Sequence, residues 1–319
     1  MAARLTLIRV DLTDAALRAR FLESYNRIWP EFAMTDREFL HEQAQPGPAG
    51  PGELWIVERA DGTGDAGVID VEQTRWNDIN TPPLACLVLD PSFRTAAALE
   101  QVVEPCERFA RAVGFEQLRV LAWERETEVV EFLLAREGWQ VTERDVDVQL
   151  DVQKAVLPER ADPEGVTFTT LAAQPELAHG TWEVLANAVV DIPGDAPEVA
   201  PDFEQWKRER SGPAYSDSTM FLALADGRVA GFAELEITEI GLRNGSAWHG
   251  FTAVHSDFRG QGIAAALKRR TIEWARANGV RFLRTENEER NAPIRQINQT
   301  LGYEPVPARV ILRGPISPA

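Results

Sequence analysis

The sequence predicts an α+β fold arranged as two similar domains in tandem. Its 319 residues are enough for two domains at the usual size of about 100 to 200 residues each. Shifting the chain by 165 positions places FARAVGFEQLRV, residues 109–120, on WARANGVRFLRT, residues 274–285. The second copy alternates between strand-like and helical stretches. We therefore expect the two halves to share one fold.

Further matches support the internal repeat and set the domain boundaries. The same shift aligns Phe93-Arg94 with Phe258-Arg259, and a shift of 164 aligns Gly67 with Gly231, Glu72 with Glu236 and Gly138 with Gly302. Between the copies, residues 154–164 read KAVLPERADPE, a charged stretch with two prolines that is typical of a linker. We expect domains at residues 1–153 and 165–319.

The second copy contains a strand, a glycine loop and a helix in direct succession. An apolar run at residues 251–254 leads to Arg259-Gly260-Gln261-Gly262, and a helical pattern lasts from there to Asn278. The first amides of a helix lack intrahelical partners and lie at the positive end of its dipole, so they bind phosphate. Glycines permit the backbone angles that let several N–H groups converge on one anion.

Two other interpretations of this loop are open on the glycines alone. One is an ordinary glycine-containing turn before a helix, with no role in ligand binding. The other is a dinucleotide site, because Gly260, Gly262 and Ala265 satisfy a loose GxGxxA pattern. Residues 255–259 intervene between the strand and the first glycine, and no second mononucleotide-binding half follows, so the dinucleotide site is disfavoured.

A longer set of spaced residues resembles the GNAT-type N-acetyltransferase superfamily. The loop Arg259-x-x-Gly262-x-Ala264 is similar to that family's acetyl-CoA pyrophosphate loop. Downstream, Thr285-x-Asn287-x-x-x-Asn291, then Asn298, then Leu301-Gly302-Tyr303 follow in the family's order. The resemblance covers about residues 165–315, and through the internal repeat it extends to a tandem arrangement, as in mycothiol synthase.

The resemblance implies a fold, a cosubstrate and a binding site. Each half would be a mixed, mostly antiparallel sheet flanked by helices. Acetyl-CoA would be the cosubstrate, with no metal. Its binding residues would be Thr252, Ala253, Val254, Arg259, Gly260, Gln261, Gly262, Ile263, Ala264, Asn287 and Asn291. The loop from Asp191 to Pro201 would lie over the acceptor site, or would be a simple ordered connection.

The first copy lacks the residues that would bind acetyl-CoA. Gly260, Gly262 and Ala264 correspond to Thr95, Ala97 and Leu99. Asn287 corresponds to Ala122, and Asn291 to Glu126 or Thr127. Because threonine resists a positive φ and leucine would crowd the helix start, we expect the first copy to have lost acetyl-CoA.

Three side chains are candidate bases for an ammonium substrate. Glu234 and Glu236 are two residues apart on one strand and share a face, although a solvated face is the plainer interpretation. His249 lies on the next strand and is either a base or a structural residue. Asn298 stands where many family members have a tyrosine that protonates the CoA thiolate, and an amide cannot act as an acid.

Composition limits the partners. The net charge is −17 and the pI about 4.8, which disfavours nucleic acid and favours a cationic small molecule. No signal-peptide pattern or long apolar run is evident, so we expect a cytoplasmic protein without membrane contact.

Cys86 and Cys106 are expected to be reduced core residues. A monomer and a homodimer are alternatives.

These inferences predict an enzyme that transfers an acetyl group from acetyl-CoA to a primary amine, of a small molecule or of a protein. The amine would attack directly in a ternary complex. The alternative from another class is a non-catalytic acyl-CoA-binding or assembly module, since the first copy has itself lost the acetyl-CoA residues.

Overall fold

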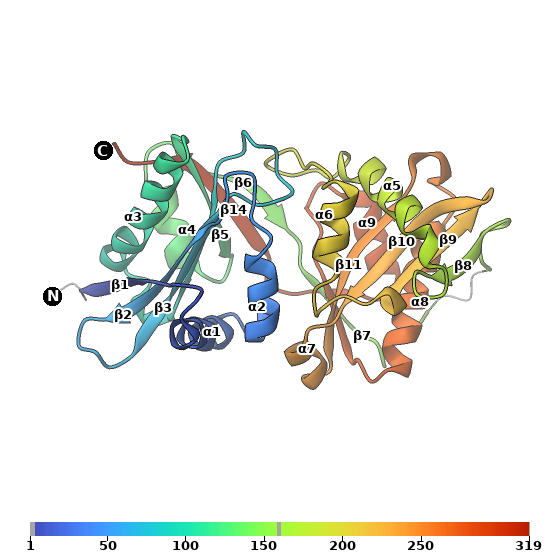
Figure 1. Cartoon of the computed structure of the whole chain (residues 1–319), viewed down its shortest axis with the longest axis horizontal. Coiled ribbons are helices and arrows are strands. Elements are labelled where there is room, and N and C mark those ends of the chain that lie inside the picture. Colours follow the sequence, from blue (N-terminus) through green and yellow to red (C-terminus); the bar gives the residue numbers. More distant parts are fainter. Residues whose placement is uncertain (1–3, 158–160, 319) are drawn as a thin grey trace. The chain divides into compact units, whose positions relative to one another are not determined.

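The computed structural model describes residues 4–157 and 161–318, which form two units with one seven-stranded sheet each (Figure 1). Unit 1 takes its described residues from 1–145, 194–197 and 307–319. Unit 2 consists of the described part of 146–193 and 198–306. Residues 158–160 of the expected linker lie outside the described residues.

The elements of unit 1 alternate between strands and helices. They are β1 (Leu5–Arg9), α1 (Ala15–Ile28), η1 (Pro30–Phe32), α2 (Asp36–Gln43), β2 (Glu53–Arg59), β3 (Asp65–Glu72), β4 (Leu84–Leu89), η2 (Pro91–Phe93), α3 (Ala96–Ala112), β5 (Gln117–Trp123), α4 (Thr127–Leu134), β6 (Gln140–Asp145) and β14 (Arg309–Pro315).

Apart from β7, β14 and the 3-10 helices, unit 2 repeats this order with one added α-helix, α7. Its elements are β7 (Val148–Asp151), β8 (Thr167–Thr170), η3 (Pro175–Leu177), α5 (Ala178–Val189), α6 (Phe203–Arg210), η4 (Asp217–Thr219), β9 (Met220–Ala225), β10 (Arg228–Glu236), α7 (Glu239–Arg243), β11 (Ser246–Val254), η5 (Ser256–Phe258), α8 (Ile263–Ala277), β12 (Phe282–Thr285), α9 (Ala292–Thr300) and β13 (Glu304–Pro305).

The two sheets have the same topology. Their strand orders are β1-β2-β3-β4-β5-β14-β6 and β8-β9-β10-β11-β12-β7-β13. Only the β4–β5 pair and the β11–β12 pair are parallel among the pairings described. The expected α+β fold, with two mixed and mostly antiparallel sheets flanked by helices, is therefore confirmed.

The sixth position of each sheet is filled by a strand from the other half of the sequence. Strand β14 pairs with β5 and β6 of unit 1, and β7 pairs with β12 and β13 of unit 2. The units therefore differ from the expected boundaries at residues 153 and 165. Only two residues separate β6 from β7, a spacing that favours a local hairpin, yet these strands lie in different sheets.

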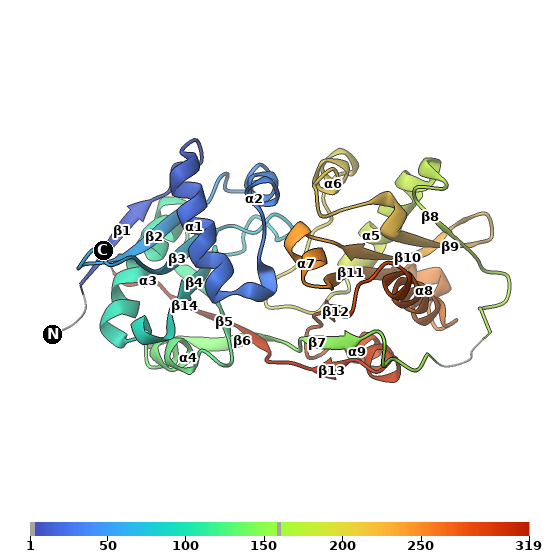
Figure 2. The ribbon, with the colours of Figure 1, turned by 90° about the horizontal axis from the view of Figure 1, so that it is seen from below.

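Both faces of the sheet in unit 1 are covered by helices. Figure 2 shows α1 and α2 on one face and α3 and α4 on the other. Neighbouring strand residues alternate between the two cores, so Val68 packs on the α1 side and Ile69 on the α3 side. Buried on both faces, these strands read as continuous apolar runs.

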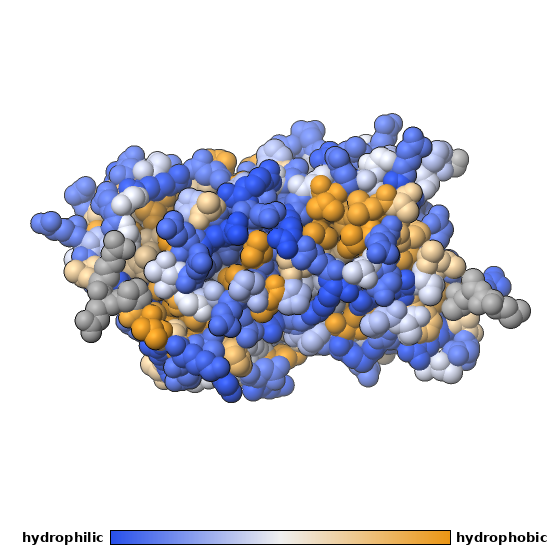
Figure 3. All heavy atoms as spheres, turned by 180° about the vertical axis from the view of Figure 1, so that it is seen from behind, coloured by the Kyte–Doolittle hydropathy of each residue, from blue (hydrophilic) through white to orange (hydrophobic). Residues whose placement is uncertain are grey.

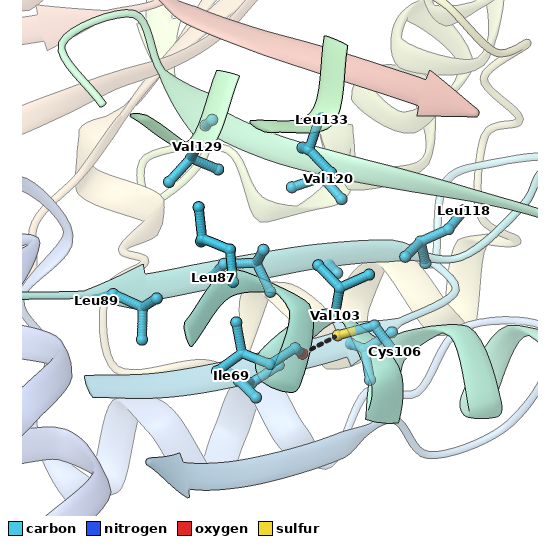
Figure 4. Packing of buried hydrophobic residues seen from close by; sticks show 14 of the residues in the cluster. Ile69, Leu87, Leu89, Val103, Cys106, Leu118, Val120, Val129 and Leu133 are labelled. Carbon is cyan, nitrogen blue, oxygen red and sulfur yellow. Dashed lines mark hydrogen bonds between the residues drawn. The ribbon is translucent and has the colours of Figure 1, made fainter. Parts of the chain in front are cut away.

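The α3 side of this sheet is a dense aliphatic core (Figure 4). Cys106 lies in it as a free thiol, with its Sγ 3.5 Å from the carbonyl of Val102. Burial raises the pKa of the Cys106 thiol. Cys86, on β4, is also free but only partly buried. The expected core position is confirmed for Cys106.

Hydrophilic side chains cover much of the face seen in Figure 3, between separate apolar areas. Large apolar side chains that stay exposed in unit 1 include Leu134 on α4 and Val141 on β6. None of the helices in the described ranges combines the length and the apolar composition that crossing a bilayer would require.

Candidate functional site

Strand β12 pairs with only the first part of β11. Their parallel pairing covers Ser246 to Trp248, whereas β11 continues to Val254. On its other edge, the end of β11 remains paired with β10. In the part of the chain that the structure describes, no strand pairs with β11 beyond Trp248 on the β12 side. The backbone groups of Thr252, Ala253 and Val254 on that edge are open to a ligand.

Buried polar atoms without partners lie on the elements around this opening. Thr252 Oγ1, Asn287 Nδ2 and both amide atoms of Asn298 are buried and make no hydrogen bond to any described residue. They come from β11, from the turn after β12 and from α9. Because buried polar groups are nearly always hydrogen-bonded, orphaned atoms here point to a bound molecule that supplies the partners.

The glycine loop has the backbone conformation expected from the sequence. Gly260 and Gly262 have φ values of +78° and +84°, in the left-handed region. Gly262 is the N-cap of α8, and no side chain caps this helix. A Cβ atom at either glycine would meet no described atom within 4 Å, so the space above the loop is open. The first amides of α8, at Ile263 and Ala264, are available to an anion.

Arg259 lies beside this loop and is held by two contacts. Its Nε donates to the carbonyl of Val254 at 3.1 Å, and its Nη1 lies 2.7 Å from the carboxylate of Asp191. Both members of this ion pair are substantially exposed, and exposed pairs contribute at most about 1 kcal/mol. A phosphate can therefore replace Asp191 at the guanidinium.

Asn291 occupies the N-cap position of α9, with Pro293 in the first turn, as the sequence predicts. Its side chain, however, makes no capping hydrogen bond. The amide group of Asn291 is thus left for another partner, like that of Asn287.

Glu234 and Glu236 share one face of β10, as predicted. Both lie against Gly250 of β11, because a Cβ atom there would approach Glu236 Oε1 to 2.6 Å and Glu234 Cγ to 3.1 Å. Glu234 also forms a mostly buried ion pair with Arg210, the last residue of α6. The role of Arg210 is not predictable from the sequence, because nothing in the local pattern links a helix end to a strand 24 residues later.

Comparisons with known proteins bear on this site. The model of the acetyltransferase (GNAT) family matches residues 185–303, which include the opening in the sheet, the glycine loop and Glu236. The segment that contains the candidate site is therefore similar to the GNAT family. No curated protein sequence is significantly similar to it.

Solved GNAT structures share the fold of the whole chain. The GCN5-related N-acetyltransferase from Sphaerobacter thermophilus is 18% identical, with a TM-score of 0.73 over 99% of this chain and 96% of that one. A tandem GNAT protein from the clavulanic acid biosynthesis pathway is 19% identical, with a TM-score of 0.75 over 99% and 100%. A GNAT-family acetyltransferase from Colwellia psychrerythraea is 15% identical, with a TM-score of 0.59 over 98% and 100%.

His249 faces away from the glutamates. It precedes Gly250 in β11 and is fully buried on the opposite face. Thr271 donates to the carbonyl of Lys268 at 2.8 Å, so its hydroxyl accepts from His249 Nε2 at 3.3 Å, and Tyr303 donates to Nδ1 at 2.8 Å. Burial holds the pKa of His249 well below its usual value. The geometry favours the structural role over that of a base.

Lys268 shares this buried polar cluster. Its side chain is 1% exposed, and its Nζ lies 5.3 Å from the ring centre of Tyr303. Burial lowers the pKa of the Lys268 ammonium from 10.5 to about 7. The spacing of apolar residues along α8 does not predict the burial of this lysine.

We expect stability to rise with pH because of Lys268. Between about pH 7 and 10.5 the unfolded chain holds a proton that the folded chain lacks. The free energy of unfolding should therefore increase by up to about 1.4 kcal/mol per pH unit in this window. Urea unfolding at pH 7.5 and 9 should show this dependence in the natural chain and in Lys207→Met, an exposed control, and lose it in Lys268→Met. A slope unchanged by Lys268→Met would contradict the assignment.

Unit 1 keeps the GNAT framework but closes the counterpart of the phosphate site. Thr95 is the N-cap of α3 and accepts from the Ala98 N–H at 3.3 Å, which occupies one of the amides that are free in α8. Leu99 is fully buried beneath it. Both features agree with the predicted loss of acetyl-CoA from this half.

The counterpart of Arg259 has turned inward. Arg94 Nε donates to the Leu89 carbonyl at 3.1 Å, as Arg259 does to Val254 165 residues later. Its Nη2, however, lies 2.9 Å from the buried carboxylate of Glu126, which is the N-cap of α4. Glu126 also accepts from the indole of Trp29 at 3.1 Å. In unit 1, therefore, Glu126 stands at the position of Asn291 and forms a buried ion pair with Arg94, the counterpart of Arg259. This arginine is no longer available to a phosphate.

The loop from Asp191 to Pro201 is fixed at its centre. Residues 194–197 belong to unit 1, where the carboxylate of Asp195 accepts from Arg119 at 2.6 and 2.9 Å. The Asp195 N–H donates to Glu143 at 2.6 Å, and the Asp195 and Arg119 side chains are 1% and 4% exposed. The bidentate pair favours the interpretation as an ordered connection for this segment.

Proposed function

We propose that this chain transfers an acetyl group from acetyl-CoA to a primary amine of a small molecule. One observation carries the proposal: the uncapped, open glycine loop of α8 lies on the same unit as an opening in the sheet and a carboxylate pair. Similarity to the GNAT family supports acyl transfer in general.

The residues of unit 2 fit acetyl-CoA. The free amides of α8 and the guanidinium of Arg259 suit its pyrophosphate. The open edge of β11 and the orphaned amides of Asn287 and Asn298 suit the amide groups of its pantetheine arm. When bound, acetyl-CoA supplies an acyl group activated as a thioester.

The acceptor side is built from the glutamates. The carboxylates of Glu234 and Glu236 attract an ammonium ion, and the net charge of −17 adds to this attraction. Glu236 lies against Gly250, where a Cβ atom would approach its Oε1 to 2.6 Å, and we assign the proton-accepting role to it. An amine must lose its proton before it can attack a carbonyl, and a carboxylate within reach takes this proton.

The leaving thiolate receives no proton from Asn298. That side chain is 2% exposed, and its amide can hydrogen-bond a sulfur but cannot release a proton at neutral pH. Tyr303, the nearest phenol in sequence, is buried against His249, and burial raises its pKa. We therefore place the acid–base work on the amine side, with direct attack and no covalent enzyme intermediate.

Replacing Glu236 by glutamine should lower kcat by about 100-fold or more, the usual effect of losing a positioned base. The measurement is thiol release from acetyl-CoA against a panel of primary amines. Glu239→Gln, an exposed carboxylate on α7, is the matched control and should retain activity. Asn298→Ala should have a smaller effect than Glu236→Gln.

Three outcomes would contradict this proposal in different ways. Equal activity of Glu236→Gln would remove the assigned base. Ping-pong kinetics with accumulating acetyl-enzyme would exclude direct attack. Tight acetyl-CoA binding without thiol release for any amine would favour the alternative, a non-catalytic acyl-CoA-binding module.

A further inference from the structure

Unit 1 contains a cavity lined by residues of α1, α2 and β3. Figure 2 shows α1 and α2 on the face of the sheet opposite α3. The volume of the cavity is about 130 Å³. Aromatic side chains form much of its wall, with the rings of Phe21 and Phe39 stacked at 5.4 Å and those of Phe21 and Tyr25 at 6.2 Å. An engineered apolar cavity of about 150 Å³ accommodates benzene, so this one admits a molecule of similar size.

Two carboxylates without partners line this cavity. Asp70 and Glu72 are two residues apart on β3 and share one face. Neither carboxylate forms a hydrogen bond or an ion pair with any residue in the described ranges, and both residues are partly buried. The nearby Arg75 is paired with Glu42 instead. Burial raises the pKa of both carboxyl groups. Such groups are stabilised in the charged form when a cation joins them.

The same carboxylate pair exists in unit 2, where a cation is built in. The shift of 164 that aligns Glu72 with Glu236 also aligns Asp70 with Glu234. In unit 2 the last residue of α6, Arg210, neutralises Glu234. The last residue of the equivalent helix α2 is Gln43, which lines the cavity and carries no charge. Unit 1 has therefore kept the two acids and lost the cation at this helix end, while Arg75, which also lines the cavity, is paired with Glu42.

We propose that unit 1 binds a small primary amine, as its ammonium ion, in this cavity and does not acetylate it. The ammonium lies beside Asp70, as the guanidinium of Arg210 lies beside Glu234 in unit 2, and the aromatic walls hold a short apolar body. The amine is not acetylated there, because Thr95 and the Arg94–Glu126 pair close the phosphate site of this unit. Binding does not depend on the proposed transferase reaction.

Calorimetry on the full-length chain without acetyl-CoA tests this, with benzylamine as the probe and benzyl alcohol as its neutral isostere. Benzylamine should bind and benzyl alcohol should not bind measurably. Asp70→Asn/Glu72→Gln should weaken the unit 1 site at least tenfold, since it removes the charge-assisted hydrogen bonds to the ammonium. Glu23→Gln/Glu100→Gln, at two exposed acids on α1 and α3, removes the same number of charges and should bind as the natural chain does.

A second pair of substitutions separates this site from the proposed acceptor site. Glu234→Gln/Glu236→Gln should leave the unit 1 site intact, whether or not the chain has transferase activity. Independently of any variant, benzylamine should slow hydrogen exchange in α1, α2 and β3 of the natural chain. Full binding in Asp70→Asn/Glu72→Gln, equal binding of benzyl alcohol, or absence of protection in these three elements would overturn the proposal.

Discussion

Replacing Gly262 by valine is expected to abolish acetyl-CoA binding by the full-length chain. Gly262 has a φ of +84° and is the uncapped N-cap of α8. A β-branched residue resists this φ, and its side chain would enter the open space from which the first amides of α8 are reached. Loss of two charge-assisted contacts, at about 1.5 to 3 kcal/mol each, weakens binding by roughly 10² to 10⁴-fold.

The structure offers a matched control at the other end of the same helix. Gly279 follows α8, has a φ of +77° and also has no described atom within 4 Å of a Cβ position. Gly279→Val therefore imposes a similar backbone strain but should leave the affinity unchanged. Calorimetry should find one acetyl-CoA per chain in the natural protein and in Gly279→Val, and none in Gly262→Val. Two equivalents in the natural chain would show that unit 1 still binds the cosubstrate, against the capping by Thr95.

Fragments cut at the sequence repeat should fail to fold, whereas a fragment that follows the exchanged strand should fold. Residues 153–319 lack β7, which lies between β12 and β13, and carry β14 without its partners. Val148, Leu150 and Val152 are buried in the core of unit 2. Burying three such side chains contributes about 5 to 9 kcal/mol, a large share of a typical net stability of about 5 to 15 kcal/mol. Residues 146–306 retain β7 and omit β14.

Circular dichroism and thermal unfolding distinguish the two fragments. We expect a cooperative transition for residues 146–306 and none for residues 153–319. A stable fold for residues 153–319, with the activity of the full chain, would show that β14 can replace β7 in its own half.

Point substitutions test the same exchange in the intact chain. Leu312→Ala, on β14, should destabilise unit 1, and Leu150→Ala, on β7, should destabilise unit 2, each by about 2 to 5 kcal/mol. Hydrogen exchange resolved along the sequence measures the two effects separately. Destabilisation of unit 2 by Leu312→Ala, or of unit 1 by Leu150→Ala, would contradict the strand order.

Local features of the fold were predictable from the sequence. The left-handed glycines at 260 and 262, the boundaries of α8 and the shared face of Glu234 and Glu236 all follow from the preferences of a few neighbouring residues. The repeat extended these predictions to the first half, where the loss of the glycines was also visible. Features of this kind depend on contacts within one element or between adjacent strands.

Features that depend on distant contacts were not predictable. The pairing of Arg313 with Gln117 across β14 and β5 joins residues 196 positions apart, and no periodicity indicates it. The position of Lys268 beside Tyr303 depends on how α8 packs on β11. The pairing of Arg210 with Glu234 joins the end of α6 to β10. The presence of Gln43 in place of this arginine at the end of α2 follows only from the equivalence of the two helices in the fold.

The exchanged strands also set an order of events during synthesis. Unit 1 has most of its residues by Asp145, but the strand between β5 and β6 ends only at Pro315, about 170 residues later. At 5 to 20 residues per second, ribosomes need roughly ten to thirty seconds to cover this distance. Throughout that interval the nascent first half has an open gap in its sheet, with unpaired edges on β5 and β6. Chaperones that cover such edges should therefore associate with nascent chains of this intermediate length and leave once β14 has emerged.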